Sequence, residues 1–180
     1  MVTTVIAPEA RAAVECVWQA LAAIPDPEIP VVSVVELGIV RGVEWRGDEL
    51  VVTVTPTYSG CPATELIAAD IDRALAASGI GKYRVETRLA PAWTTDWIAP
   101  GARERLARFG IAPPGTRAKS AGAGIIDASA ITARRASPRI ACPRCASSNT
   151  REISRFGSTP CKAQYRCEDC LEPFDYFKPH

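Results

Sequence analysis

Two Cys-x-x-Cys pairs constrain the end of this chain more than any other feature of its sequence. Cys142 and Cys145 form the first pair, Cys167 and Cys170 form the second, and twenty-one residues separate the pairs. Two residues between cysteines allow a tight turn to direct both sulfurs at one ion, and two such turns complete the tetrahedron that zinc prefers. The spacing therefore predicts a four-cysteine metal site, with disulfide bonds as the less favoured alternative. Four thiolates accept either zinc or iron.

At 180 residues the chain is longer than one average domain but short for two large ones, so a main domain with a small metal-stapled module is expected. Its 47% hydrophobic and 23% charged content is typical of a soluble globular protein. No apolar run reaches the roughly 18 residues that a membrane span needs. Residues 1–10 lack the pattern of a secretory signal. We therefore expect a cytoplasmic protein with reduced thiols and no membrane partner.

The order of periodic segments predicts an α/β fold. Pro25 ends the first helical pattern, Arg46-Gly47-Asp48 joins two runs of strand character, and Gly79 marks the end of the second helix. This order predicts a small α-β sandwich, in which a three-stranded sheet carries helices on one face. The expected elements are a helix at residues 9–23, strands at 38–45 and 49–55, a helix at 62–77 and a strand at 82–89.

Beyond this core, Trp93, Trp97 and a short helix at residues 102–109 are expected to form an appendage that lies across the first domain. Residues 113–138 are rich in Ala, Gly, Pro, Ser and Arg, which predicts a flexible linker. The expected organisation is an α/β domain at residues 1–112, a linker at 113–138 and a four-cysteine ribbon at 139–180.

Cys61 lies in Thr55-Pro-Thr-Tyr-Ser-Gly-Cys61-Pro62, at the expected start of the second helix. Unsatisfied backbone N–H groups and the positive end of the helix dipole favour a thiolate there, which makes the sulfur a better metal ligand or nucleophile. A buried cysteine that fills a small gap is the ordinary alternative. Gly60 and Pro62, which expose the backbone and fix the helix start, favour a functional role.

Asp26 and Glu28 form an acidic loop that prolines stiffen, Asp26-Pro-Glu28-Ile-Pro30. Held in a defined direction, the two carboxylates could supply oxygen ligands or a docking contact. A solvated acidic turn that ends the preceding helix explains the residues equally well. Ser33 and Glu36 follow at capping-box spacing, which predicts a short helical turn.

The usual catalytic sets are missing from the sequence. The only histidine is His180, so a Ser-His or Cys-His relay inside the main domain is excluded for this chain alone. No Gly-rich phosphate loop has the required spacing. We therefore do not expect an enzyme. Cys16 falls opposite Trp18 on the first helix and is interpreted as incidental, and Cys161 is assigned no role.

Nucleic-acid binding is a weak alternative. Residues 1–112 carry ten basic and fourteen acidic side chains, and residues 113–180 carry eleven and six. Four thiolates around a divalent ion would reduce the positive balance of the tail by about two charges. The basic residues near the first cysteine pair are scattered along the chain, at Arg134, Arg135, Arg139 and Arg144. Phosphate-driven binding would weaken steeply with added salt.

Two segments together resemble known families. Asp26-Pro-Glu28-Ile-Pro30, with the segment from Thr55 to Pro62, resembles the small domain of iron-sulfur cluster assembly factors of the SufT type. The tail resembles the D subunits of bacterial phenylacetyl-CoA epoxidases, also called PaaD or PaaJ. That likeness is carried by Phe156-Gly-Ser-Thr-Pro-Cys161, Phe174-Asp-Tyr-Phe177-Lys178, the four paired cysteines and Trp93-Thr-Thr-Asp96-Trp97. Nearly the whole chain is covered except the linker.

The resemblance implies a role in aerobic phenylacetate breakdown, where a di-iron oxygenase epoxidises the ring with electrons from an iron-sulfur flavoprotein reductase. It implies a non-enzymatic accessory subunit that assists maturation of the reductase cluster. The implied partners are the oxygenase and reductase subunits and the iron-sulfur assembly machinery. Carried over to this chain, Cys61 binds a transient iron-sulfur cluster beside the loop of Asp26 and Glu28, and the paired cysteines bind the zinc or iron of the tail.

A structural adaptor is the alternative function, docking oxygenase and reductase through the acidic loop, Trp93 and Trp97. The chain also departs from the family at its end. Pro179 follows Lys178 where members often end in Phe-Lys-Cys. A second site that such a cysteine would form with Cys161 is therefore not expected.

Overall fold

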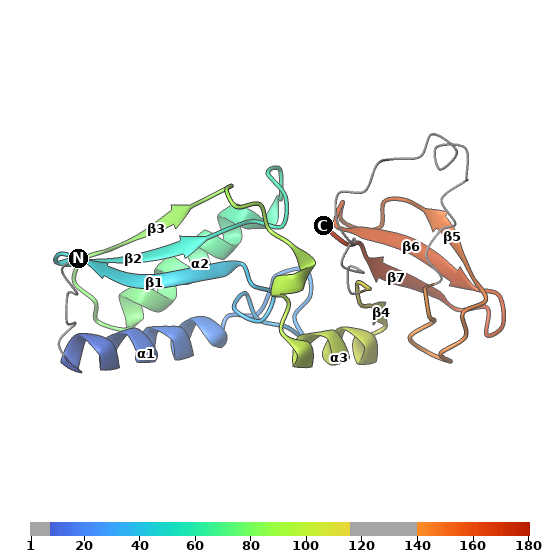
Figure 1. Cartoon of the computed structure of the whole chain (residues 1–180), viewed down its shortest axis with the longest axis horizontal. Coiled ribbons are helices and arrows are strands. Elements are labelled where there is room, and N and C mark those ends of the chain that lie inside the picture. The colour runs from blue at the N-terminus through green and yellow to red at the C-terminus, as the bar shows by residue number, and fades with distance from the viewer. Residues whose placement is uncertain (1–7, 116–139) are drawn as a thin grey trace, which may run out of the picture. The chain divides into compact units, whose positions relative to one another are not determined.

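The computed structural model describes residues 8–115 and 140–180, with side chains from residue 14 onward. The chain divides into two units: residues up to Leu106 together with His180, and Ala107–Pro179. Each unit is built around its own sheet, and Figure 1 shows the elements of both. Among the described helices, none combines the length and the apolar character needed to cross a membrane.

The sheet of the first unit has the strand order β1-β2-β3. β1 (Val40–Arg46) and β2 (Glu49–Val54) are antiparallel, and Gly47 in the turn between them has a φ of 68°, which glycine adopts without steric cost. β3 (Tyr83–Thr87) runs parallel to β2, so the connection needs a crossover, which a helix supplies. The predicted hairpin and third strand are confirmed.

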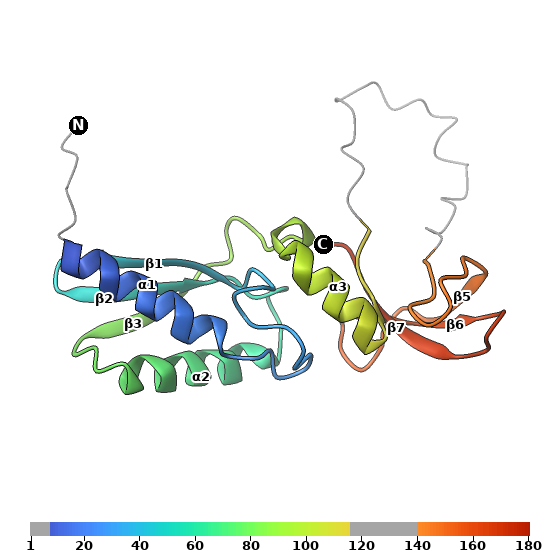
Figure 2. The ribbon, with the colours of Figure 1, turned by 90° about the horizontal axis from the view of Figure 1, so that it is seen from below.

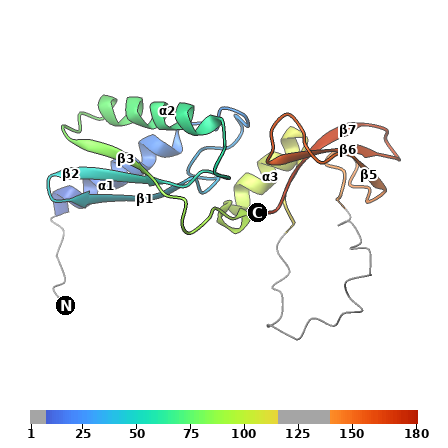
Figure 3. The ribbon, with the colours of Figure 1, turned by 90° about the horizontal axis from the view of Figure 1, so that it is seen from above.

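Two helices, α1 (Pro8–Ala22) and α2 (Ala63–Ala77), pack on the same face of this sheet, as Figures 2 and 3 show. Alternate residues of a strand share a face, so one set of strand side chains meets the apolar stripes of both helices. Gly79, just beyond α2, has a φ of 71° and ends the helix where the sequence predicts. The fold class is confirmed. Eight residues of the resulting core are each at most 4% exposed: Val17, Leu21, Leu50, Val52, Val54, Ile67, Ile71 and Leu75.

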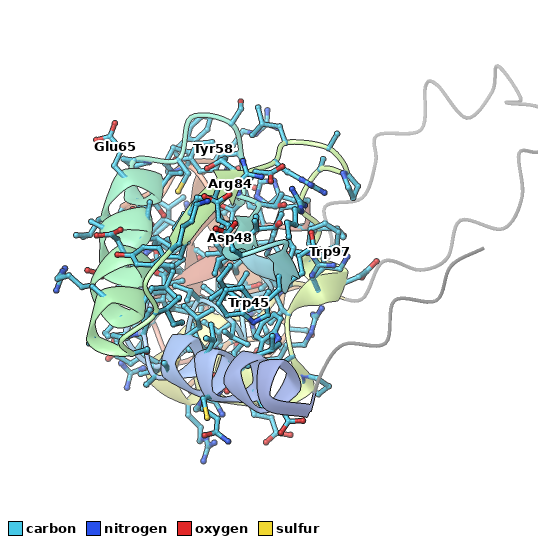
Figure 4. The ribbon with its side chains drawn as sticks, turned by 90° about the vertical axis from the view of Figure 1, so that its left-hand side faces the viewer. Trp45, Asp48, Tyr58, Glu65, Arg84 and Trp97 are labelled. Atoms are coloured by element: carbon cyan, nitrogen blue, oxygen red, sulfur yellow. The ribbon has the colours of Figure 1, made fainter. Side chains whose placement is uncertain are left out.

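The opposite face of the sheet carries ion pairs in place of a helix. The register puts Glu44, Val51 and Arg84 in one row across the three strands. Val51 is fully buried, which the aliphatic stems of its long charged neighbours explain. Figure 4 shows Arg84 on its strand and Trp45 on the side of α1. The ion pairs are Arg46 with Glu44 and Glu86, Arg84 with Glu49 and Glu86, and Arg88 with Glu86.

The loop between α1 and β1 contains the predicted capping box. Ser33 Oγ accepts a hydrogen bond from the Glu36 N–H at 3.2 Å, and Glu36 Oε2 accepts one from the Ser33 N–H at 3.0 Å. The Leu37 N–H donates to the Ser33 carbonyl at 2.9 Å and completes one helical turn. Partial burial alone would raise the pKa of Glu36, but the Ser33 N–H and the Arg105 guanidinium hold it below its ordinary value.

Residues 93–106, which the sequence assigns to an appendage of the first domain, lie against this turn. Trp93 Nε1 donates to the Leu37 carbonyl at 3.0 Å. Arg105 Nε donates to the Val31 carbonyl at 3.0 Å, and the same guanidinium forms an ion pair with the capping-box glutamate. The regular elements of the appendage are the short 3-10 helix η1 (Thr95–Trp97) and the helix α3 (Pro100–Phe109).

The second unit is a four-stranded sheet in the order β4-β7-β6-β5. Aromatic rings form its small core: the Tyr165 ring lies 5.9 Å from that of Phe174 and 5.6 Å from that of Tyr176. β4 is parallel to β7, and the other neighbours are antiparallel. The strands are β4 (Ile111–Ala112), β5 (Thr150–Ser154), β6 (Lys162–Cys167) and β7 (Pro173–Phe177).

The boundary between the units differs from the one expected from the sequence. Ile111 and Ala112, which the sequence assigns to a first domain at residues 1–112, pair with β7 in the second sheet. Ala112 also shares a buried cluster with Ile140. Most of the expected linker at residues 113–138 lies outside the described residues. The connection from Ala112 to Ile140 therefore begins and ends in the same unit.

Gly38 lies against Trp97, so a substitution at Gly38 tests how tightly the appendage packs on the first unit. A Cβ at Gly38 would lie 2.6 Å from Trp97 Cβ, and its φ is 72°. We expect Gly38→Ala to lower the free energy of unfolding by more than the roughly 1–3 kcal/mol of the strained backbone alone. All four tryptophans precede residue 98, so their fluorescence in urea reports this unit. Gly79→Ala is the matched control, since Gly79 has a φ of 71° and a Cβ added there would meet no atom within 4 Å. Equal losses in the two variants would contradict the packing role of Trp97.

Candidate functional site

The four paired cysteines come together in the second unit. Cys142 and Cys145 lie on the turn that precedes β5, Cys167 ends β6, and Cys170 lies on the turn that leads to β7. Their sulfur atoms all lie within 4.8 Å of one another. The Sγ atoms of Cys142 and Cys170 are 3.7 Å apart, and those of Cys145 and Cys167 are 3.6 Å apart. The structure thus brings together the ligand set that the spacing predicts.

These separations fit a metal site. A zinc–sulfur distance of about 2.3 Å places the sulfurs of a regular tetrahedron roughly 3.8 Å apart, close to the two measured values. A disulfide would need about 2.05 Å between sulfurs, and all the cysteines are free thiols. The arrangement can therefore bind a metal ion through four thiolates, and the donor set accepts zinc or iron.

Both metal-binding turns bend at a residue in the left-handed backbone region. Ala146, with a φ of 60°, and Leu171, with a φ of 66°, each directly follow the second cysteine of a pair. In the second turn, the Cys170 N–H points at Cys167 Sγ at 3.5 Å. This hydrogen bond, helped by the neighbouring thiols, lowers the pKa of the Cys167 thiol to about 7. The backbone therefore favours the thiolate form at Cys167, whereas hydrogen bonding among the thiols and burial raise the pKa of Cys145 and Cys170.

Asp169 joins the two turns. Its carboxylate accepts hydrogen bonds from Ser147 Oγ at 2.5 Å and from Asn149 Nδ2 at 2.7 Å, and these bonds lower the pKa of Asp169. Arg151 Nε donates to Glu168 Oε1 at 3.0 Å and adds a second link. Such outer contacts restrict the orientation of the ligands. The sequence interpretation missed these residues, whose only local signal is a polar stretch beside each cysteine pair.

Cys161 of the tail and Cys16 of the first helix are not members of this cluster. Cys161 is buried, and its sulfur lies 3.0 Å from Thr159 Oγ1. Cys16 is exposed on α1. In the part of the chain that the structure describes, the four paired cysteines are the group of Cys, His, Asp and Glu side chains placed to hold a metal ion.

Cys61 lies at the entrance to α2, where the sequence places it. Its N–H donates to the Tyr58 carbonyl at 3.1 Å, and its own carbonyl accepts a hydrogen bond from the Thr64 N–H at 3.2 Å, so a tight turn carries it. Pro62 caps the helix with a φ of −67°, one residue before the first helical residue. The Cys61 side chain is partly exposed. A ligand role for Cys61 stays a prediction.

Asp26 helps to close the loop in which it lies. It is 6% exposed, and its Oδ1 accepts hydrogen bonds from the N–H of Glu28 at 3.0 Å and of Ile29 at 2.8 Å. The Asp26 N–H donates to the Val32 carbonyl at 2.9 Å. One oxygen of the carboxylate therefore has a structural task, while Glu28 is partly exposed. A cofactor-binding role for either residue stays a prediction.

The acidic loop and the cysteine loop lie at the same end of the first sheet. Val40, which begins β1, pairs with Val54, which ends β2. The loop at residues 25–39 enters the sheet at this end and the loop at 55–62 leaves it there, an arrangement that can be followed in Figure 1. The fold therefore places the two predicted segments on neighbouring connections.

Comparison with known proteins defines the class. A family described as iron-sulfur cluster assembly protein matches residues 4–86, and a PaaD zinc beta ribbon domain matches residues 127–178. A solved domain of unknown function from Bacillus anthracis is 27% identical with a TM-score of 0.51, covering 54% of this chain and 94% of that chain. The chain thus combines an α/β domain of the iron-sulfur assembly type with a zinc β-ribbon.

Full-length similarity identifies the family. A protein of Escherichia coli K12, named as the D subunit of 1,2-phenylacetyl-CoA epoxidase, is 49% identical over 162 residues, which are 90% of each chain. An Fe-S protein maturation auxiliary factor from Porphyromonas gingivalis is 31% identical over 94 residues, covering 51% of this chain and 89% of that one. This chain belongs to the family of phenylacetyl-CoA epoxidase D subunits. The family resemblance inferred from the sequence is confirmed.

Loss of one sulfur should remove the metal. We expect Cys142→Ser to lose bound metal and to unfold the ribbon, because metal binding by such modules supplies about 10–16 kcal/mol in zinc-finger peptides. Metal content by mass spectrometry and the dispersion of the ribbon NMR signals measure both effects. Cys16→Ser is the control and should keep the full metal content. A folded, metal-loaded Cys142→Ser protein would contradict the four-thiolate site.

Leu171 offers a test of the strained turn. Its side chain is 57% exposed and its φ is positive, so Leu171→Gly should relieve roughly 1 kcal/mol of backbone strain at little cost in packing. Hydrogen exchange of the β6 amides in the metal-loaded protein should slow accordingly. Leu66→Gly, at an exposed position inside α2, should destabilise its own unit by about 1 kcal/mol. Faster exchange of β6 in Leu171→Gly would disprove the strain.

Proposed function

We propose that this chain is an accessory protein of the phenylacetyl-CoA epoxidase system and that its α/β domain delivers an iron-sulfur cluster to a client, most directly the reductase component. In this role the chain is not an enzyme. The cluster is cargo that Cys61 binds briefly through its thiolate. The partners are the oxygenase and reductase subunits and the iron-sulfur assembly machinery.

One observation carries the proposal: a partly exposed cysteine stands at a helix entrance in a domain that matches iron-sulfur cluster assembly proteins. From the sequence, no histidine is expected inside the main domain, but the structure groups His180 with the first unit, where it lines a pocket together with residues 55–59. A transient cluster ligand needs a sulfur that an incoming cluster can reach, and Cys61 is partly exposed. The likeness of residues 4–86 to iron-sulfur cluster assembly proteins supports the ligand role.

The acidic loop has two parts in this proposal. Asp26 shapes the loop through its two backbone hydrogen bonds. Glu28, which is partly exposed, supplies the carboxylate that faces iron or the client. For the ribbon we propose zinc as a structural ion at Cys142, Cys145 and the second cysteine pair, since the matched ribbon family is described as binding zinc. An absorption spectrum separates colourless zinc from coloured iron in that site.

The alternative is an adaptor that docks oxygenase and reductase through the acidic loop, Trp93 and Trp97, and the two tryptophans lend it less support. Trp93 is 4% exposed, and its indole N–H is bonded to the Leu37 carbonyl. Trp97 is half-buried against Gly38. The pair therefore holds the appendage in place and offers a partner little surface.

Cys61→Ser tests the proposed delivery. Expressed with the other components of the pathway, this variant should leave the reductase with a several-fold lower iron and sulfide content per polypeptide, and ring epoxidation should fall in parallel. Cys16→Ser, which changes another accessible thiol of the same unit, should leave both unchanged. Full cluster occupancy of the reductase in the Cys61→Ser strain would remove the delivery role. Co-purification of the chain with the oxygenase in that strain would then support the adaptor.

A further inference from the structure

A groove opens on the face of the first sheet that the helices leave uncovered. Its volume is about 390 Å³, within the range of roughly 300–1,000 Å³ of small-molecule sites. Its lining includes Arg41, Arg88, Trp97 and the buried Thr53 and Thr55. Figure 4 shows Trp97 across the sheet from α2. Neither Cys61 nor the cysteine cluster lines this groove, so it is separate from the sites described above.

Arg41 is the cation of the groove that has no acidic partner. Its guanidinium carbon lies 3.5 Å from the centre of the Trp97 ring, so the flat face of the group is occupied by stacking. Among residues 14–115 and 140–180, no carboxylate forms an ion pair with it. Partial removal from water lowers the pKa of Arg41, but an arginine stays charged at neutral pH. A stacked guanidinium keeps its N–H edge for an incoming acceptor.

The other charges of this face are matched to one another. Glu44, which also lines the groove, accepts hydrogen bonds from two nitrogens of Arg46 at 2.5 and 2.8 Å. Arg88 Nε donates to Glu86 at 2.8 Å, which leaves its two terminal nitrogens for a further acceptor. This face carries four arginines and three glutamates: Arg41, Arg46, Arg84, Arg88, Glu44, Glu49 and Glu86. The unmatched positive charge is thus concentrated at Arg41.

We propose that this groove binds an oxyanion, the phosphate or carboxylate group of a small molecule. The N–H edge of Arg41 and the terminal nitrogens of Arg88 supply planar donors of the kind that recognise carboxylate and phosphate through two hydrogen bonds. The Trp97 ring fixes the plane of one donor in advance, which lowers the entropic cost of binding. The hydroxyl groups of Thr53 and Thr55 add neutral donors in the same lining.

The test uses inorganic phosphate and acetate as separate probes on the full-length protein. Titration at constant ionic strength is followed by the indole N–H signals in a nitrogen-15 NMR spectrum, with Trp97 assigned from Trp97→Phe. We expect a saturable shift of the Trp97 signal at millimolar phosphate or acetate, and no such shift with chloride. The stronger of the two probes identifies the ligand as phosphate-bearing or carboxylate-bearing. A linear drift that chloride reproduces would overturn the proposal.

Variants of the groove separate specific binding from general attraction. Arg41→Gln should weaken the affinity by about tenfold, and Arg41→Lys should lie between it and the unmodified chain, because lysine keeps the charge and loses the planar edge. Arg88→Gln provides a second loss of affinity if the first variant disturbs the fold. Arg73→Gln is the matched control on α2, where the side chain is 73% exposed, and should leave the titration unchanged. Equal affinity in all four variants would overturn the site.

Discussion

A three-stranded sheet has two faces, and the two helices of the first unit cover only one of them. The second face must therefore be covered by other side chains, and the ion pairs of this unit do so. The Glu86 carboxylate forms ion pairs with the guanidinium groups of Arg46, Arg84 and Arg88 on this face. Individual surface pairs contribute only about 0–1 kcal/mol each. Their larger effect is to cover Val51 with aliphatic stems and to keep apolar partners away from the sheet.

The same uncovered face explains the position of the appendage. At the end of the sheet, residues after β3 turn back and pack on the capping-box turn through Trp93 and Arg105. Trp97 then stands beside the groove and stacks on Arg41. Trp97 therefore packs against Gly38 through its backbone and Cβ, and its ring contacts the Arg41 guanidinium. Trp97 thus serves both the packing of the appendage and the proposed oxyanion groove.

The ribbon solves a different problem, because its core is small. Its buried cluster includes Cys142 and Cys167 alongside a few aromatic and aliphatic side chains. A sheet of this size buries too little apolar surface to be stable without a metal or another cross-link. The hydrogen bonds of Asp169 and the two positive-φ residues determine the conformation of the two turns, and so the positions of the ligating sulfur atoms. In this unit, contacts that position the sulfurs for the metal therefore also stabilise the fold.

Local signals in the sequence predict much of this structure. Periodicity predicts the helices and strands of the first unit, the spacing of Ser33 and Glu36 predicts the capping box, and the cysteine pairs predict the ligand cluster. The remaining features depend on contacts between distant segments. β4 is two residues long and is defined only by its pairing with β7, so no window around it could reveal it. Ala146 and Leu171 adopt positive φ without being glycine or asparagine, so composition gives no warning.

The placement of β4 changes how the chain can be divided. Because Ala112 and Ile140 belong to one buried cluster, both ends of the stretch between them lie in the second unit. The covalent junction between the units falls instead within α3, between Leu106 and Ala107. A fragment that starts at residue 139 would lack an edge strand of its own sheet.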